Sequence, residues 1–410
     1  MSQGLLANYF TGICAKRLSH VEIDSSKSNQ HEFNVTRELK QLLGKAEPVK
    51  FQTRFLYLDD VSDPLDESDV MTWYDSRREN PTRSEYRLYY RSTISSKSAK
   101  AGDTLILAKK ENSEILAIIA SSGSTIERQL LWLFGLPSDL GTQFSFEETV
   151  QLQRSDFITR LIFDKLGIEI EEAPNDLELI LSRFGHKFPT TRQFSEFARE
   201  TAPSITEYKN SDSALMAWMS REELLFRQLE KHVVSERLKE GFVSGNDIDV
   251  DGFISFSLSV QNRRKSRVGL AFENHLEEIF IQSDIKYKRG AVTEHKEKPD
   301  FIFPGIEEYK SLDFSPELLS MLGVKTTCKD RWRQVLTEAK RVDFKHLITL
   351  EPAISENQTT QMKTANLQLV VPQEIHQSYS ETQQKWLINL EVFIHHLRTQ
   401  NNSTPNTTAP

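Results

Sequence analysis

The sequence has very few cysteines: only Cys14 and Cys328 occur in 410 residues, and they lie far apart. Structural zinc modules need closely spaced Cys and His ligands, and disulfide frameworks need several paired cysteines, so neither is expected. The sequence also lacks an uninterrupted apolar run of about 18 residues, the length of a membrane-spanning helix. The first residues, MSQGLLANYF, lack the charged start and long apolar core of a signal peptide. These absences favour a cytosolic protein.

The charge balance is acidic, with 51 Lys and Arg residues against 59 Asp and Glu residues and a formal net charge of −8. Affinity for phosphate depends on the local density of positive charge, so nucleic-acid contacts would need local basic patches. Residues 324–340, VKTTCKDRWRQVLTEAK, form one such patch, with five Lys or Arg in seventeen residues. This stretch could be a solvated helix face, a nucleic-acid contact or part of an active site. It also contains Asp330 and Glu338, which a simple phosphate-binding patch does not require.

A chain of this length is expected to form two domains. Residues 1–175 are predicted to form a β-rich domain followed by a linker. LILAKK at 105–110 and EILAIIAS at 114–121 are short apolar runs joined by a turn, which is typical of a β-hairpin. Ser124 and Glu127 then have capping-box spacing before an apolar helical run.

Residues 176–400 are predicted to form an α/β domain with a mixed sheet, followed by a disordered polar tail at 401–410. The pattern is helical from 190 to 245, and a further helix is expected to start after the basic cluster NRRKSR at 262–267. Strands are predicted after it at FIF 301–303, MLGVKTT 321–327, HLITL 346–350 and LQLVV 367–371. A last helix is predicted at about 382–398.

Asp300 and Lys325 are the first candidate catalytic pair. Asp300 precedes the apolar run FIF, and Lys325 ends another predicted strand 25 residues later. A carboxylate binds Mg²⁺ through oxygen, and a bound metal polarises a scissile phosphate and lowers the pKa of a bound water. The Lys neutralises developing charge or positions that water. Asp plus Lys at loose spacing occurs in many unrelated chains, and Asp300 alone could be a turn residue.

A second carboxylate is needed, and the usual acidic position two residues before the Lys is occupied by Gly323. Glu338, 13 residues after Lys325, is a candidate in a segment predicted to be helical from about 329, although it could be a solvated helix residue. Glu273 borders the apolar face of its predicted helix, where a carboxylate is costly unless it is paired or metal-bound. The alternative for Glu273 is a partly buried residue paired with a nearby Lys or Arg.

Together these motifs resemble the catalytic domain of EcoRII-type restriction endonucleases. The resemblance covers roughly residues 185–375 in order, carried by NRRKSR at 262–267, Glu273 with His275, PDFIFP at 299–304 and VKTTCKDRWRQ at 324–334. It implies a restriction-endonuclease-like α/β core of the PD-(D/E)XK type, in which the second acidic residue is swapped to the position of Glu338. By the same resemblance Asp300 and Glu338 are the Mg²⁺ ligands, Lys325 is the catalytic lysine and Glu273 is an additional active-site residue.

The resemblance also implies DNA-reading residues. Lys329, Asp330 and Arg331 would read the outer C·G pairs in the major groove, since Lys and Arg donate to guanine and Asp accepts from cytosine. Arg263 and Arg264, with Lys265 and Arg267, would contact phosphates or cap the Glu273 helix. Relatives flip the central base pair into a pocket. The residues in the region of that pocket are Trp218, Arg221 and Phe226, for which core packing is the alternative.

Residues 77–91 are rich in Arg and Tyr, and DSRRENPTRSEYR at 75–87 resembles part of the EcoRII N-terminal effector domain, a DNA-binding pseudobarrel. CAKRLS at 14–19 and TREL at 36–39 contribute to this resemblance. It implies that Glu85 and Arg87 read bases, and that Lys16, Arg77 and Arg83 make further DNA contacts. Taken alone, the stretch could be an exposed strand with cross-strand charge pairs.

The sequence therefore predicts a Mg²⁺-dependent, site-specific DNA endonuclease of a restriction–modification system, acting as a homodimer in the prokaryotic cytosol. The resemblance implies a CCWGG-like site, an N-terminal domain that binds a second site copy as allosteric effector and autoinhibitor, and a separate methyltransferase. Two alternatives stay open: a non-catalytic DNA-binding regulator, and a repair nuclease that recognises DNA structure.

Overall fold

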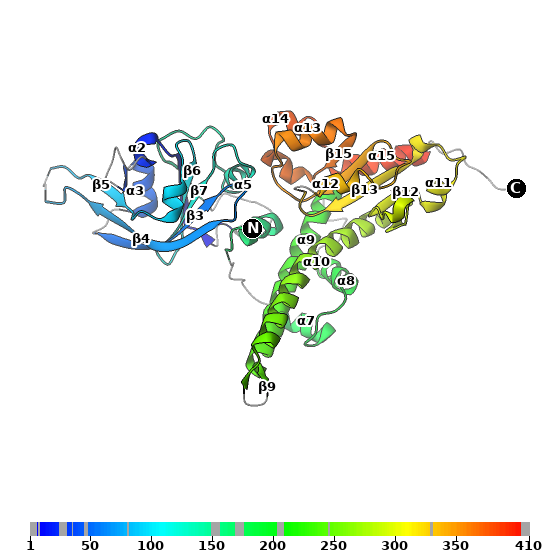
Figure 1. The fold of residues 1–410 in the computed structure, drawn as a ribbon, viewed down its shortest axis with the longest axis horizontal. Helices are drawn as coiled ribbons and strands as arrows, with labels where there is room; N and C mark the ends of the chain where they lie inside the picture. The colour runs from blue at the N-terminus through cyan, green and yellow to red at the C-terminus, as the bar shows by residue number, and fades with distance from the viewer. Residues whose placement is uncertain are drawn as a thin grey trace. The chain divides into compact units, whose positions relative to one another are not determined.

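The chain folds into two compact units, Met1–Ile170 and Glu171–Pro410 (Figure 1). The computed structural model describes residues 6, 9–23, 31–34, 36–44, 48–79, 82–148, 156–168, 176–202, 209–244, 247–328 and 331–402. Lys329, Asp330 and most of the predicted tail, residues 403–410, lie outside these residues. Of the helices in the described part of the chain, none combines the length and the apolar character that a membrane crossing needs.

The first unit is built on one eight-stranded sheet in the order β2-β5-β4-β3-β7-β6-β1-β8. Its strands are β1 Gly12–Arg17, β2 Glu32–Asn34, β3 Val49–Leu58, β4 Leu65–Asp75, β5 Tyr86–Tyr89, β6 Thr104–Lys109, β7 Glu114–Ala120 and β8 Ser145–Glu147. Its helices are α2 His20–Ile23, α3 Arg37–Leu43, α4 Ile94–Ser98, α5 Thr125–Leu133 and α6 Asp156–Lys165. Among the described strands of this unit, β3 and β7 pair in parallel and the other ladders are antiparallel.

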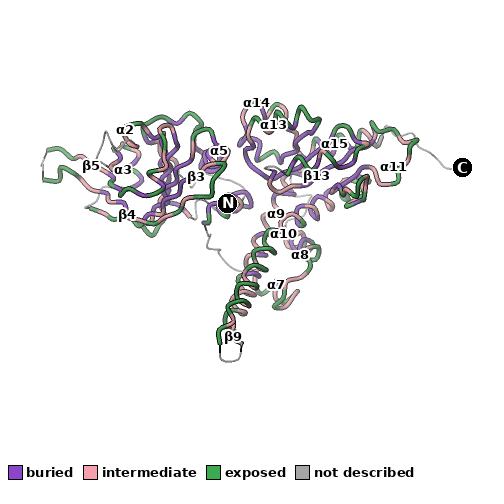
Figure 2. Tube along the Cα trace, in the orientation of Figure 1, coloured by how far each residue is buried: buried purple, intermediate pink, exposed green. Residues whose placement is uncertain are grey.

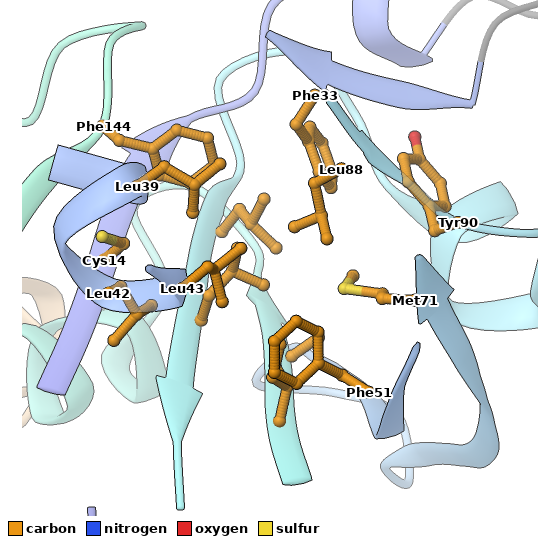
Figure 3. Packing of buried hydrophobic residues seen from close by; sticks show 14 of the residues in the cluster. Cys14, Phe33, Leu39, Leu42, Leu43, Phe51, Met71, Leu88, Tyr90 and Phe144 are labelled. Carbon is orange, nitrogen blue, oxygen red and sulfur yellow. The ribbon is translucent and has the colours of Figure 1, made fainter. Parts of the chain in front are cut away.

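The sheet curls around one hydrophobic cluster, which closes it into a barrel-like shape. Buried side chains from α3 and from strands across the sheet meet there (Figure 3). Phe33 on the edge strand β2 and Phe144, just before the opposite edge strand β8, have ring centroids 6.1 Å apart. Two edges far apart in strand order can touch only if the sheet curls back on itself. The predicted β-rich pseudobarrel is confirmed.

Two short sequence motifs in this unit predicted local structure: the hairpin at 105–121 and the helix start at Ser124. β6 and β7 form the predicted antiparallel hairpin. The Ser124 side chain accepts a hydrogen bond from the backbone of Glu127 and begins α5. The Glu127 carboxylate does not return the bond to the cap, as a capping box would; it accepts from Thr104 and Gly123 and pairs with Arg17. It thereby ties α5 to the strands.

The second unit contains a five-stranded mixed sheet in the order β11-β12-β13-β14-β15. The strands are β11 Lys288–Arg289, β12 Phe301–Phe303, β13 Ser320–Lys325, β14 Lys345–Thr349 and β15 Leu367–Val370. The β11–β12 and β12–β13 pairs are antiparallel, whereas the pairs β13–β14 and β14–β15 are parallel. The predicted α/β core with a mixed sheet is therefore confirmed.

Helices flank this sheet and form the rest of the unit. They are α7 Leu177–Phe184, α8 Thr191–Glu200, α9 Ser211–Glu240, α10 Val250–Gln282, α11 Ile306–Lys310, α12 Trp332–Val335, α13 Glu356–Thr364, α14 Glu381–Gln384 and α15 Leu390–Asn402. α10 packs against β13, while α12 and α13 pack against β14 and β15. The predicted last helix at about 382–398 is two helices, because residues around Ile388 bridge to Val370 at the edge of the sheet.

α9 and α10 form a long helical hairpin, connected by the short strands β9 Val243–Ser244 and β10 Asp247–Ile248 (Figure 1). The expectation that a helix starts after residues 262–267 is wrong. α10 begins at Val250, where the Asp249 side chain accepts from the backbone of Gly252. The NRRKSR cluster lies in the middle of the helix, so its side chains cannot cap it.

Gly323 on β13 packs directly against Val335 of α12. A Cβ added there would lie 2.8 Å from Cγ2 of Val335, the last residue of α12, and 3.1 Å from its Cγ1. Both residues are buried, and Val335 is 0% exposed. Any side chain at 323, including the acidic residue usual in related nucleases, would push α12 away from the sheet.

Replacing Gly323 with Ala should therefore destabilise the second unit by about 1–3 kcal/mol, the usual cost of overpacking a core. Scanning calorimetry of the full chain measures this loss. Adding Val335→Ala should remove most of the clash, so the effects of the two changes should not add. Gly269→Ala on α10 is the matched control, because its Cβ meets nothing within 4 Å. An equal loss in both Ala variants would contradict the contact.

His346 makes the stability of this unit depend on pH. It lies on β14, is 3% exposed and packs with its ring centroid 4.8 Å from that of Phe393. Burial, with a smaller contribution from the nearby His396, lowers its pKa from 6.5 to about 3. The folded chain therefore keeps His346 neutral where the unfolded chain protonates it. Stability that is present above about pH 6.5 is lost as the pH falls toward 3.

We predict that His346→Leu flattens the loss of stability between pH 7 and pH 4. The measurement is hydrogen exchange of peptides from β13 to β15, corrected for the intrinsic pH dependence of exchange. His395→Leu, at an exposed position of α15, is the control and should keep the wild-type slope. An unchanged slope in His346→Leu would show that other groups carry the dependence.

Candidate active site

Asp300 and Lys325 meet where β12 and β13 run side by side. Asp300 precedes β12, and its Oδ2 accepts a 2.6 Å hydrogen bond from the backbone N–H of Val324 and a 2.9 Å bond from Nζ of Lys325. Both side chains are 19% exposed. The pairing follows from the antiparallel register, which places Phe301 opposite Leu322 and so brings the residue before β12 to the carboxyl end of β13. The structure therefore brings together the two residues that the sequence singled out.

Glu338 joins this pair from the segment after α12. It is 9% exposed, and its Oε2 has no hydrogen-bond partner among the described residues. Burial, and then repulsion from Asp300, raises its pKa to about 7, while Lys325 acts in the opposite direction. Glu338 therefore lies within electrostatic range of both Asp300 and Lys325.

The helical placement expected for Glu338 is wrong. α12 ends at Val335, and Glu338 lies in the turns that follow. The next residue, Ala339, has φ of 48°, a left-handed conformation that no α-helix continues through. The Glu338 carboxylate is therefore held by a turn after α12 and not by a helix.

Glu273 approaches the same cluster from α10. Burial, and then Asp300, raises its pKa, whereas Arg289 and Lys325 lower it. Nη2 of Arg289 donates to Glu273 at 2.8 Å. The alternative of a partly buried Glu paired with an Arg is thus observed. The negative charge of Asp300 also acts on the Glu273 carboxylate and raises its pKa.

Arg289 was not identified from the sequence. It lies on β11, and its Nη1 also donates to Asn274 at 2.8 Å and to Glu277 at 2.9 Å. This one guanidinium therefore fixes a full turn of α10 to the sheet edge beside Asp300. Its sequence context, KYKRG, has no spacing that would have revealed this role.

A buried ionic layer fixes the other side of α10. Arg267 is 6% exposed and pairs with Glu222 and Glu223 of α9, and His275 Nε2 lies 3.0 Å from Glu222 Oε2. Arg267 is therefore not positioned for a phosphate contact. Breaking a buried pair leaves an uncompensated charge, so this layer holds the two helices in one register.

The remaining basic residues of the cluster point elsewhere. Arg264 pairs with Glu230 of α9 at 2.6 Å, and the guanidinium of Arg263 lies 4.5 Å from the ring centroid of Phe188. Both residues are exposed, as a phosphate contact requires. To contact a phosphate, Arg264 would have to keep or leave its ion pair with Glu230, and Arg263 its contact with the Phe188 ring.

The proposed base-reading triplet is only partly described, because Lys329 and Asp330 lie outside the described residues. Arg331 is exposed. The segment before it is anchored: the backbone N–H of Cys328 donates at 2.6 Å to Glu351, a 3% exposed carboxylate just after β14. Glu351 was not identified from the sequence, and it fixes the loop that leads from Lys325 to the triplet.

The three residues suggested for a base-flipping pocket have structural partners. Trp218 and Phe226 are 2% and 3% exposed, and Phe226 belongs to a cluster between α7, α8 and α9. Arg221 makes a bidentate ion pair with Asp176 at 2.5 and 2.9 Å. The structure thus places both aromatic rings in the core, which was the alternative reading.

In the first unit, three of the predicted DNA-contacting residues lie together near β4 and β5. Glu85 pairs with Arg77 at 2.5 Å and with Arg87 at 2.9 Å, and Arg87 also pairs with Glu32 at 2.6 Å. Asp75, the last residue of β4, accepts from the backbone of Arg77 and of Glu85 and shapes their loop. The cross-strand charge pairs expected as an alternative are therefore present.

Lys16 and Arg83 differ from this group. Lys16 lies on β1, is 5% exposed and pairs with Glu22 at 2.6 Å. A lysine held in this way would have to leave its partner to contact DNA. Arg83 is exposed in the loop between β4 and β5.

The cluster of Asp300, Glu338, Glu273 and Lys325 fits a hard divalent cation. Among the described residues, no group of three or more His, Cys, Asp or Glu side chains lies close enough to enclose a metal ion. Mg²⁺ often binds through one or two carboxylates and completes its shell with water and substrate phosphates. Glu338 Oε2, buried without a partner, is an oxygen that such an ion would satisfy.

Among solved structures, the chain is similar to two restriction endonucleases bound to DNA. Metal-depleted Ecl18kI in complex with uncleaved, modified DNA has a TM-score of 0.46 and 19% identity, covering 57% of this chain and 86% of that one. A PspGI–substrate DNA complex has a TM-score of 0.44 and 16% identity, covering 53% of this chain and 95% of that one.

Sequence relatives and a family model agree with the motifs. The chain is 36% identical over 230 residues to the type II restriction enzyme EcoRII of Escherichia coli, covering 56% of this chain and 55% of that protein. It is 29% identical over 124 residues to the type II restriction enzyme SsoII of Shigella sonnei, covering 28% of this chain and 40% of that protein. The chain thus spans about half or less of the length of these curated relatives. The family model described as EcoRII C terminal matches residues 226–394, so the predicted resemblance is confirmed: this segment is similar to the C-terminal part of EcoRII-type type II restriction endonucleases.

Proposed function

We propose that this protein is a Mg²⁺-dependent, site-specific endonuclease that cuts double-stranded DNA in a restriction–modification system of the prokaryotic cytosol. The observation that carries the proposal is the convergence of Asp300, Lys325 and Glu338 at the end of β13. The 36% identity to EcoRII over 230 residues supports the same activity. By the resemblance of the motifs, the recognition site would be CCWGG-like. A host methyltransferase would protect that site.

Each residue of the cluster has a distinct role in this proposal. Asp300 and Glu338 would hold Mg²⁺, which supplies charge neutralisation at the scissile phosphate and a lowered pKa for a bound water. Lys325, held at the same carboxylate, would neutralise charge that develops on the phosphate. Glu273 would orient groups at the edge of the cluster, with Arg289 fixing its position.

Recognition would use the loop between β13 and α12. Lys329, Asp330 and Arg331 combine donors and an acceptor, as reading G·C pairs in the major groove requires. The hydrogen bond from Cys328 to Glu351 fixes the segment that leads from Lys325 toward this triplet. Arg263 and Arg264 would contact phosphates. A flipped central base would need Trp218, Arg221 or Phe226 to leave its present partners.

The first unit would bind a second copy of the site as an allosteric effector and would restrain cleavage without it. The Arg77–Glu85–Arg87 network supports this role, since alternating donors and acceptors at one strand end match base edges. A homodimer would present two catalytic units to the two strands of a near-palindromic site. Effector binding that favours an open state is linkage between two sites.

Cleavage tests the catalytic assignment. Asp300→Ala, Lys325→Ala and Glu338→Gln should each lower the rate of plasmid cleavage in Mg²⁺ by about 100-fold or more, because each removes a group that stabilises charge at the phosphate. Lys286→Ala, at an exposed position in the same unit, is the control and should cut normally. Variants as active as the wild type would exclude the assignment. Specific DNA binding by a wild type that never cuts would favour a regulator, and cutting of branched DNA without sequence preference would favour a repair nuclease.

A second experiment tests the effector role. Cleavage ends are mapped on a plasmid with one site, with and without a short duplex that carries another site. The duplex should stimulate the wild type, whereas Glu85→Ala and Arg83→Ala should need about 5- to 100-fold more of it, the range of one lost base or phosphate contact. Arg91→Ala is the control, since Arg91 is 72% exposed near the same strand and pairs only loosely with Asp69. Equal stimulation of all variants would contradict the role.

A further inference from the structure

Two histidine side chains that the proposed function does not use meet on the surface of the second unit. His186 follows α7, and His232 lies on α9, against which α7 packs. Nδ1 of His186 and Nε2 of His232 are 2.8 Å apart, and the ring centroids are 5.0 Å apart. From residue 231 to its end near β9, α9 is exposed or partly exposed, and His186 is exposed (Figure 2). Ions in solution can therefore reach both rings.

Helix ends hold the two rings together. α7 ends at Phe184, and Gly185 then takes φ of 65°, a left-handed conformation that reverses the chain. The N–H of Gly185 donates at 2.8 Å to the carbonyl of Leu181 and closes the helix. Five residues later, Thr190 begins α8 with a capping box. The connection that carries His186 is thus fixed at both ends, which lowers the entropy cost of keeping both rings near one ligand.

The separation of the two imidazoles suits a transition-metal ion. Metal–nitrogen bonds of about 2.0–2.1 Å place two ligand nitrogens about 2.8–3.4 Å apart, from square-planar to tetrahedral angles, and the two ring centroids about 4.5–5.2 Å apart. A tilt of the rings therefore exchanges their shared hydrogen bond for two bonds to one ion. We propose that His186 and His232 chelate a divalent ion of the class that imidazole favours, such as Zn²⁺, Ni²⁺ or Cu²⁺.

Glu236 is the third ligand of the proposed site. It follows His232 by four residues on α9, a spacing that places two side chains on one helix face and that zinc-binding helices use. Its pKa is lowered first by the hydrogen bond from Lys239 and then, to a smaller extent, by the charges of His232 and His186. In this structure Lys239 holds the carboxylate at 2.7 Å, and no three ligands are gathered in the described part of the chain. The ion would have to draw Glu236 away from Lys239, so this lysine weakens the site.

The site differs in chemistry from the carboxylate cluster around Asp300. Mg²⁺ prefers oxygen ligands and keeps several waters, whereas imidazole nitrogen favours transition metals. A bound ion would tie the segment after α7 to α9 and so brace α8, whose Arg192 donates at 2.7 Å to Glu277 of α10. An ion that binds the folded chain alone stabilises it, so the site is a structural clamp on this group of helices.

Titration calorimetry of the full chain, stripped of metal and without DNA, tests the site with Zn²⁺ and with Ni²⁺. The wild type should bind one ion here with a Kd in the micromolar range, weaker than a four-ligand structural site. His186→Ala and His232→Ala should each weaken binding at least about tenfold, the loss that follows even when an outer partner of a metal ligand is removed. Glu236→Gln should weaken it less, and Lys239→Ala should strengthen it, because Glu236 is then released.

Two control variants should keep the site. Asp300→Ala separates it from the carboxylate cluster, and His395→Ala removes another exposed histidine of the same unit. With Cu²⁺, electron paramagnetic resonance should show two coordinating nitrogens in the wild type and one in either single histidine variant. Circular dichroism checks that every variant is folded.

Three results would each overturn the proposal. They are a wild type that binds no ion at micromolar concentrations, histidine variants that bind as tightly as the wild type, and a Cu²⁺ spectrum without two nitrogen ligands. The two rings would then share a hydrogen bond and nothing more. Because the assays contain no DNA, their outcome does not depend on whether the chain cuts.

Discussion

The candidate site depends on the two hydrogen bonds that Asp300 accepts from β13. One carboxylate oxygen holds the backbone of Val324 and the ammonium of Lys325. The bond to the backbone fixes the edge of β12 against β13, and the bond to Lys325 fixes the direction of the lysine. The chain reaches this arrangement through strand pairing, so the carboxylate and the lysine are placed by the same ladder that builds the core. Glu273 and Glu338 then approach this pair from α10 and from the segment after α12.

The position of Glu338 follows from a packing constraint at Gly323. A side chain at 323 would collide with Val335, and the absence of that side chain lets α12 settle close to the sheet. Glu338 follows α12 in a turn, and its burial, with repulsion from Asp300, raises its pKa to about 7. Gly323, at the usual acidic position, thus makes room for Val335 of α12. In the proposed site, Glu338 in the turn after α12 supplies the carboxylate in place of a residue on the strand.

The sequence was sufficient for the parts of the fold that local pattern decides. The hairpin of β6 and β7, the start of α5 and the strands around Asp300 and Lys325 follow from short apolar runs and from one capping residue. The start of α10 could not be predicted, because residues 253–260, FISFSLSV, alternate between apolar residues and serine, a period typical of strands. Packing against α9 and the cap at Asp249 decide for a helix. Arg289 and Glu351 were missed for a related reason: their roles come from neighbours distant in sequence, and no spacing motif marks them.

A crystal structure of the full chain with a duplex that carries the candidate site, grown with Ca²⁺ in place of Mg²⁺ to hold back cleavage, tests the central claim most directly. The account predicts a cation bound by Asp300 and Glu338 next to a backbone phosphate, with Lys325 turned from Asp300 toward that phosphate. A cation bound elsewhere, or a Glu338 that stays buried without a ligand while DNA occupies the sheet edge, would contradict it.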